Sequence, residues 1–308
     1  MSYNTISETR NLVIGMKRRT FVKSGLAATT LSVATNTYSP LSSRPTGDSR
    51  VDEQLSPKSG LRHSVCKWCY PDLTVEELAL AGKSEGLESV ELLDPDDWQV
   101  LKKHGMTCAM ANGASQITKG FNRIENHEWL IPGFDKRLRE AAAADIPNVI
   151  CFSGNREGMD DEQGLENCVI GLQKIMPAAE RLGVNVCMEL LNSRVDHHDY
   201  QCDHTAWGVE LVKRVGSDRF KLLYDIYHMQ IMEGDVIRTI RDNIDYIGHF
   251  HTGGNPGRHE IDETQELNYR AIAQAIADTG FTGFIAQEFI PTHDPATSLR
   301  QAILRCSV

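Results

Sequence analysis

Residues 62–71 read RHSVCKWCYP, and this stretch decides between the two folds that the rest of the chain allows. It is a short apolar run that ends in Lys67-Trp68-Cys69-Tyr70-Pro71, and it opens a series of strand-like runs that alternate with amphipathic stretches. A doubly wound open sheet normally carries a glycine-rich phosphate loop directly after its first strand. No glycine follows this run, so the sequence favours a closed parallel barrel.

The alternation continues to the end of the chain. The apolar runs lie at 62–68, 88–93, 106–111, 148–153, 184–191, 220–225, 245–251 and 283–289. The amphipathic, helix-like stretches lie at 75–81, 96–104, 137–144, 165–182, 205–215, 235–240, 269–277 and 297–306. Eight strand–helix units share residues 61–308, and a stretch of that length suits one α/β domain, a (β/α)8 TIM barrel of about 250 residues.

Composition narrows the class of protein. The chain has 308 residues, of which 41% are hydrophobic and 24% charged, with a net charge of −10. These values exclude collagen-like, disordered and multi-span membrane proteins. Residues 61–308 hold 24 Lys and Arg against 38 Asp and Glu, a net charge of −14. A domain this acidic repels phosphate backbones, so we expect no nucleic-acid partner, whereas one well-placed arginine could still hold a small anionic substrate.

The N-terminal segment has the layout of an export signal. Residues 17–23 read KRRTFVK, and a short, weakly apolar run follows at 25–34. Paired arginines ahead of such a run resemble a twin-arginine signal, and the run is too short to be a stable membrane anchor. We therefore expect residues 1–34 to direct export to the periplasm by the twin-arginine machinery, with 35–60 as a flexible linker rich in Ser, Thr, Pro and Gly. The alternative is a disordered basic tail on a cytoplasmic protein.

Eight cysteines raise the question of disulfides in an exported chain. Cys108, Cys151 and Cys187 lie inside apolar runs, where cysteine usually acts as a small buried hydrophobic residue. Cys66 and Cys69 form a C-x-x-C pair without a second pair at zinc-site spacing, so we interpret them as structural. Proteins exported by the twin-arginine route cross already folded, and the thiols can therefore stay reduced.

The last four apolar runs each end in one carboxylate or imidazole: Glu189, Asp225, His251 and Glu288. The active site of a barrel enzyme lies at the C-terminal ends of its strands, so we expect these side chains to converge. Three carboxylates packed together repel one another and take up protons unless a cation balances them. The set predicts one divalent metal ion, with Mn²⁺ or Mg²⁺ favoured and Co²⁺ or Zn²⁺ compatible. The alternative is four separate rim residues in salt bridges.

Neighbouring residues add candidates for substrate binding. His249 and His251 face the same side of their strand, and we expect His249 to be a hydrogen-bonded core residue one layer below the ligand His251. His228 follows Asp225 by three residues and is expected to touch substrate. The Gly- and Pro-rich loop before Arg258 can turn this guanidinium back over the barrel mouth, where it would grip a carboxylate or vicinal hydroxyls. The pair at 197–198 is expected to be solvated and without a role.

Several segments together resemble the hydroxypyruvate isomerase family, within the xylose-isomerase-like sugar isomerases and epimerases. They are MELLN at 188–192, YDIYHMQ at 224–230, NPGRHE at 255–260 with ELNY at 266–269, and QEF at 287–289. The resemblance covers about residues 61–306.

The resemblance implies a metal held at Glu189, Asp225, His251 and Glu288, with Glu189 and Glu288 also acting as acid/base groups. It implies substrate contacts from His228 and Arg258. Hydroxypyruvate isomerases usually carry Gln where this chain has His251, whereas ketose epimerases carry His.

The resulting hypothesis is a metal-dependent isomerase that acts on a small hydroxy-carbonyl or sugar substrate by proton transfer through a cis-enediolate. A ketose 3-epimerase would use the same residues, and a keto-sugar or inositol dehydratase would share the enolate and then expel a β-hydroxyl. A DNA-repair endonuclease needs more histidines and a basic face, and a non-catalytic exported sugar-binding protein is the remaining alternative. Barrels of this kind often form homo-oligomers, although no apolar stripe marks an interface.

Overall fold

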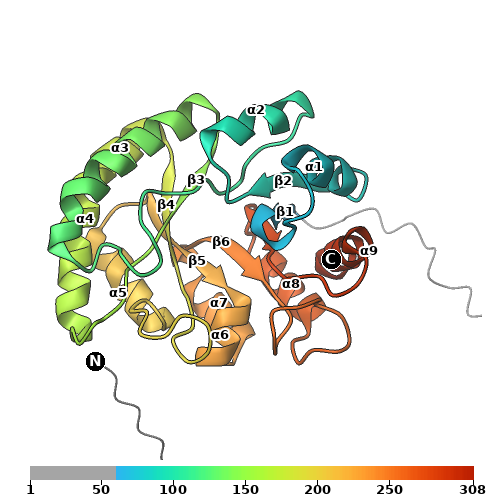
Figure 1. Ribbon diagram of the computed structural model, residues 1–308. Helices are drawn as coiled ribbons and strands as arrows, with labels where there is room; N and C mark the ends of the chain where they lie inside the picture. The colour runs from blue at the N-terminus through green and yellow to red at the C-terminus, as the bar shows by residue number, and fades with distance from the viewer. Residues whose placement is uncertain (1–59) are drawn as a thin grey trace, which may run out of the picture. The chain divides into compact units, whose positions relative to one another are not determined.

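The computed structural model describes residues 60–308. The predicted signal at 1–34 and the predicted linker up to residue 59 lie outside the described part. Within it, parallel strands curl into a barrel that is surrounded by helices (Figure 1). The predicted α/β barrel is therefore confirmed.

Seven strands make up the sheet, in the order β2-β1-β7-β6-β5-β4-β3. The strands are β1 (Arg62–Cys66), β2 (Leu87–Glu91), β3 (Asn148–Cys151), β4 (Asn185–Glu189), β5 (Phe220–Asp225), β6 (Ile247–Thr252) and β7 (Phe284–Gln287). Seven of the eight predicted runs are thus regular strands. The first ends earlier than predicted, because Lys67–Cys69 form a 3-10 turn, η1.

The remaining predicted run, 106–111, is not a regular strand but still closes the barrel. Isolated parallel bridges join it to β2 and β3: Ser89 with Thr107, and Ala111 with Val149. Side chains interrupt the ladder at Ala109, because its N–H donates to Ser89 Oγ at 2.7 Å and its carbonyl accepts from Asn148 Nδ2 at 2.8 Å. The prediction of a regular strand here was wrong, but the run lies between β2 and β3 as expected.

Helices cover the outside of the sheet (Figure 1). They are α1 (Val75–Lys83), α2 (Pro95–Lys103), α3 (His127–Ala143), α4 (Asp161–Leu182), α5 (Thr205–Val215), α6 (Ile226–Met232), α7 (Val236–Asn243), α8 (Tyr269–Asp278) and α9 (Pro295–Cys306). Thr74 caps α1 and forms a capping box with Glu77, and Gly183 ends α4 with φ 73°. None of the helices in the described residues combines the length and apolar character of a membrane span.

Two helices differ most from prediction. The stretch predicted at 137–144 begins ten residues earlier, at His127, because the helix α3 accommodates Pro132 instead of starting after it. Helix α6 was not predicted at all. It starts directly after β5, and the carboxylate of Asp225 caps it by accepting a hydrogen bond from His228 N at 3.1 Å. A predicted metal ligand therefore also fixes the start of a helix at the barrel mouth.

Alternation along the strands sets the depth of each layer inside the barrel. Cys187, Leu223, Met110 and Ile150 form a small buried cluster. Glu189 and Asp225 lie two residues further along the same strands as Cys187 and Leu223, so their side chains point to the same interior, one layer nearer the mouth. All eight cysteines are free and buried, so no disulfide forms between them.

Candidate functional site

The ends of β4, β5, β6 and β7 bring four side chains together at the C-terminal mouth of the barrel. Glu189, Asp225, His251 and Glu288 each place one ligand atom within 4.8 Å of all the others. Asp225 and His251 are fully buried, and Glu189 and Glu288 are nearly so. The sequence predicted this convergence from strand ends alone, and the structure places the four residues as that prediction requires.

His251 lies at the centre of the group. Its Nδ1 is 2.7 Å from Glu288 Oε2 and 3.1 Å from Glu189 Oε1. Burial opposes a charge on the ring, but the acidic groups around it, led by Cys66 and Glu288, raise the pKa of His251 well above its usual range. Nδ1 is thus the nitrogen of His251 that faces the carboxylates of Glu288 and Glu189.

The pKa values of the three carboxylates are shifted in different directions. Burial raises the pKa of Asp225 to about 7, against the opposing effect of Arg258, and burial also raises the pKa of Glu189. Burial acts on Glu288 as well, but Arg258 and His251 outweigh it and hold the pKa of Glu288 well below its usual range. A bound divalent cation would oppose the burial that raises the pKa of Asp225 and Glu189, and three oxygen donors with one nitrogen fit a hard divalent ion.

Arg258 reaches across the mouth from the loop after β6. Its Nη2 donates to Asp225 Oδ2 at 2.8 Å and to Glu288 Oε2, and its Nε donates to the Glu288 carbonyl at 3.1 Å. The loop makes a tight turn, in which a Cβ at Gly254 would lie 2.2 Å from the carbonyl of Glu260. Arg258 itself has φ 57°, and this left-handed conformation is held by main-chain bonds to Gly254 and Ile290.

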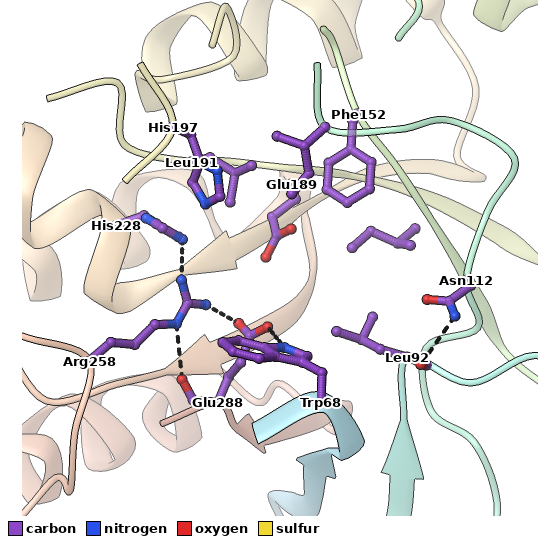
Figure 2. A pocket seen from close by; sticks show the side chains of 12 residues that line it. Trp68, Leu92, Asn112, Phe152, Glu189, Leu191, His197, His228, Arg258 and Glu288 are labelled. Carbon is purple, nitrogen blue, oxygen red and sulfur yellow. Dashed lines mark hydrogen bonds and ion pairs between the residues drawn. The ribbon is translucent and has the colours of Figure 1, made fainter. Parts of the chain in front are cut away.

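His228 lies in the first turn of α6, fully buried. The side-chain amide nitrogen of Asn192 lies 2.6 Å from His228 Nδ1. On the other edge of the ring, Nη1 of Arg258 donates to His228 Nε2 at 2.6 Å (Figure 2). Burial, followed by the charge of Arg258, lowers the pKa of His228 well below its usual range, so the ring is neutral. His228 therefore holds the guanidinium of Arg258 at the cavity wall, where a substrate oxygen could accept from Arg258.

A cavity of about 350 Å³ opens above these groups. Glu189, Glu288, His228 and Arg258 lie along one part of its wall (Figure 2). The other lining residues are Trp68, Leu92, Asn112, Ile117, Ile150, Phe152, Leu191 and His197. The size suits a small ligand, and the ionisable groups lie together.

Three residues of the site were missed by sequence reasoning. Glu91, at the end of β2, is fully buried and lies 2.8 Å from both His249 Nε2 and His251 Nε2. Trp68 donates its indole N–H to Glu288 Oε1 at 2.7 Å. Asn192 holds His228, as described above. Glu91 lies inside the apolar run at 88–93, which continues into Leu92 and Leu93, and the other two depend on contacts between distant segments.

Two histidine predictions have different outcomes. His249 is fully buried one layer below His251 and bonds to Glu91, as the alternation of the strand predicts. His197 was expected to be solvated, and this was wrong. It lines the cavity with its ring 5.2 Å from that of His228, because the loop after β4 folds over the mouth. His198 is exposed.

Comparison with known proteins agrees with this architecture. A family model described as Xylose isomerase-like TIM barrel matches residues 84–306. A putative hydroxypyruvate isomerase of Mus musculus is 30% identical over 250 residues, which cover 75% of this chain and 90% of the relative. The chain belongs to the xylose isomerase-like TIM barrel family, and the names of its relatives confirm the predicted class of enzyme, an isomerase.

Solved structures give the same fold. The crystal structure of an AP endonuclease, family 2, from Brucella melitensis has a TM-score of 0.67 and 26% identity, over 78% of this chain and 96% of that one. The crystal structure of a D-psicose 3-epimerase in the presence of D-fructose has a TM-score of 0.63 and 22% identity, over 79% and 90%. At that identity, the second match shows the fold alone.

Proposed function

We propose that this protein is a metal-dependent isomerase that moves a proton next to the carbonyl of a small hydroxy-ketone, as hydroxypyruvate isomerases do. The observation that carries the proposal is the group of four ligand atoms within 4.8 Å of one another, directly beneath a small cavity. A relative named as a putative hydroxypyruvate isomerase, at 30% identity over most of both chains, supports the same chemistry.

Glu189, Asp225, His251 and Glu288 would hold one divalent ion, with Mn²⁺ or Mg²⁺ preferred over Co²⁺ or Zn²⁺ for this oxygen-rich set. Such an ion polarises a carbonyl and its neighbouring hydroxyl and so makes the adjacent C–H bond more acidic. Asp225 is positioned by its role as the cap of α6.

Glu189 and Glu288 are the proton carriers in this proposal. They come from β4 and β7, which β5 and β6 separate in the sheet, and both carboxylates face the cavity (Figure 2). One carboxylate removes the carbon-bound proton, which leaves a cis-enediolate. The same group can return the proton to the neighbouring carbon, and this is isomerisation.

A ketose 3-epimerase is the second candidate, and the placement of these two carboxylates favours it. Carboxylates on strands at opposite sides of the group can act on opposite faces of one carbon, as epimerisation requires. His251 also matches the residue that ketose epimerases carry at this position.

His228 and Arg258 would bind the substrate oxygens. The guanidinium of Arg258, which donates to His228 Nε2 at 2.6 Å, is a donor at the cavity wall and can stabilise the negative charge that develops on an enediolate oxygen. The domain's net charge of −14 argues against a DNA substrate despite the structural match to a family 2 AP endonuclease.

Metal analysis of the purified protein, followed by a deuterium-exchange screen, tests the function. Hydroxypyruvate, tetruloses and hexuloses are incubated in D₂O with Mn²⁺ or Mg²⁺. Metal-dependent exchange and an isomeric product support the isomerase, and label at C3 of a recovered ketose with inverted configuration identifies the epimerase. An ultraviolet-absorbing enone would identify a dehydratase. Binding without exchange would contradict catalysis and indicate a sugar-binding protein.

We also propose that the twin-arginine machinery exports the protein to the periplasm, on the strength of KRRTFVK at 17–23. Replacing Arg18 and Arg19 together with lysine is expected to keep the protein in the cytoplasmic fraction. Equal distribution of this variant and the unaltered chain would contradict export by this route.

A further inference from the structure

A buried carboxylate with no role in the proposed chemistry lies beneath the site. Glu91 ends β2, which is not one of the four strands that carry the grouped residues, and its side chain is fully buried. Its Oε2 has no hydrogen-bond partner among the described residues. A buried charge without full pairing is costly, so its presence calls for a compensating interaction.

That interaction is with the histidines of β6. Glu91 Oε1 lies 2.8 Å from His251 Nε2 and 2.8 Å from His249 Nε2. A carboxylate can only accept, so both imidazoles present an N–H to the same oxygen. Two parallel donors from one strand hold the Glu91 carboxylate in place, and His249 has no other side-chain partner in the described part of the chain.

The consequence lies on the other edge of the His251 ring. Because Nε2 keeps the hydrogen that bonds to Glu91, Nδ1 is the nitrogen that can give up its hydrogen and offer a lone pair to an ion. Nδ1 is the nitrogen that lies 2.7 Å from Glu288 Oε2 and 3.1 Å from Glu189 Oε1. The ring thus joins a deep carboxylate to the group at the mouth, and an ion that took the place of the Nδ1 hydrogen would lie among these carboxylates.

We propose that Glu91 is a positioning residue for the metal site. By accepting the Nε2 hydrogen of His251, it fixes the tautomer and orientation of that ring and makes Nδ1 a better ligand. His249 anchors Glu91 through the second hydrogen bond. This inference rests on the proposed function, because it assigns a role to Glu91 only if the group at the mouth binds a divalent ion.

The test compares Glu91→Gln with Glu88→Gln. Glu88 lies on the same strand, and its side chain pairs with Arg62 at the surface. The affinity of each purified variant for Mn²⁺ is measured by electron paramagnetic resonance titration, without substrate. Loss of a partner that supports a metal-binding histidine typically weakens affinity by roughly 10- to 100-fold. We expect that loss for Glu91→Gln and unchanged affinity for Glu88→Gln.

A second measurement needs no variant at Glu91. Long-range ¹H–¹⁵N spectra of the unaltered protein with Zn²⁺ bound report which nitrogen of each imidazole carries hydrogen, and His251→Gln identifies the His251 signals by their loss. We expect hydrogen on Nε2 and the metal on Nδ1.

Three results decide the matter. Hydrogen on Nδ1 of His251, or Mn²⁺ affinity of a folded Glu91→Gln variant within twofold of the unaltered protein, would overturn the role of Glu91 and leave the proposed function standing. Failure of the unaltered protein to bind Mn²⁺ would overturn the proposed metal site, and this inference with it.

Discussion

The two halves of the barrel mouth differ in chemistry. The half from β4 to β7, here called the polar half, contributes Glu189, His228, Arg258 and Glu288 to the cavity wall. The half from β1 to β3, here called the apolar half, contributes Leu92, Ile117, Ile150 and Phe152, together with Trp68 and Asn112. The side-chain amide of Asn112 donates hydrogen bonds to the Leu92 carbonyl at 3.2 Å and to Asp94 Oδ2 at 3.3 Å.

This difference separates two tasks. The apolar half has no ionisable group at the cavity, so it cannot move a proton. It can exclude water from one side of the ligand, and this strengthens the electrostatic interactions on the other side. We therefore expect substitutions in the polar half to change catalysis, and substitutions in the apolar half to change stability and the fit of the ligand.

Glu288→Gln is expected to have the largest effect. Gln keeps the size of the side chain but cannot accept the substrate proton, so solvent exchange of that proton should fall about 10²- to 10⁴-fold. Exchange is followed by NMR in D₂O, and bound metal is measured in the same sample because Glu288 is also a proposed ligand. Glu263→Gln, at an exposed carboxylate, is the control. A fully metal-loaded variant with undiminished exchange would remove Glu288 from the mechanism.

Arg258→Lys should rank next. Lysine keeps the charge but lacks the planar guanidinium, which donates hydrogen bonds to Asp225, Glu288 and His228. We expect kcat/KM for the best substrate of the exchange screen to fall about 10²-fold. Arg305→Lys, at a surface ion pair, should be neutral. Equal kinetics for the two variants would show that the guanidinium of Arg258 does not contact substrate.

Ile150→Ala addresses the apolar half. Ile150 packs with Met110, Cys187 and Leu223 inside the barrel, so its truncation should reduce the free energy of unfolding by about 2 to 5 kcal/mol, measured by urea titration. KM should rise, while kcat falls less than in Glu288→Gln. Ile170→Ala, on the exposed face of α4, is the stability control. A loss of kcat as large as that of Glu288→Gln would break the division between the two halves.

The polar half was largely predictable from the sequence, and the reason is local. Glu189, Asp225, His251 and Glu288 each follow a short apolar run, so strand geometry alone places them at one rim. The apolar half was harder. The run at 88–93 continues past Glu91 into Leu92 and Leu93, which hides the end of the strand.

Other details depend on contacts that no local pattern contains. The regular ladder at 106–111 is broken by side chains of Ser89 and Asn148, which belong to the two neighbouring strands. The hydrogen bond from Trp68 to Glu288 joins residues that are 220 positions apart in the sequence. Helix α6 was missed because its cap, Asp225, was interpreted only as a ligand.

The smallest expected effect concerns a carboxylate of the polar half that serves structure alone. Glu260 is buried and accepts hydrogen bonds from Thr292 N and His293 N, at 2.7 and 3.0 Å, and from the hydroxyls of Thr292 and Ser298. These bonds join the loop that carries Arg258 to the loop after β7 and to α9. Burial opposes the charge on Glu260, but the hydrogen bonds prevail and lower its pKa to about 2.

Because the pKa of Glu260 is lower in the folded state than its value of 4.5 in an unfolded chain, its ionised form stabilises the fold above pH 4.5, and this contribution is lost as the pH falls towards 2. Glu260→Gln should therefore cost about 1 to 3 kcal/mol at pH 7, since it leaves N–H and hydroxyl donors poorly satisfied. The difference from the unaltered protein should shrink at pH 3, as measured by urea unfolding at both pH values. A constant difference at both pH values would show that shape, and not charge, is what Glu260 supplies to this rim.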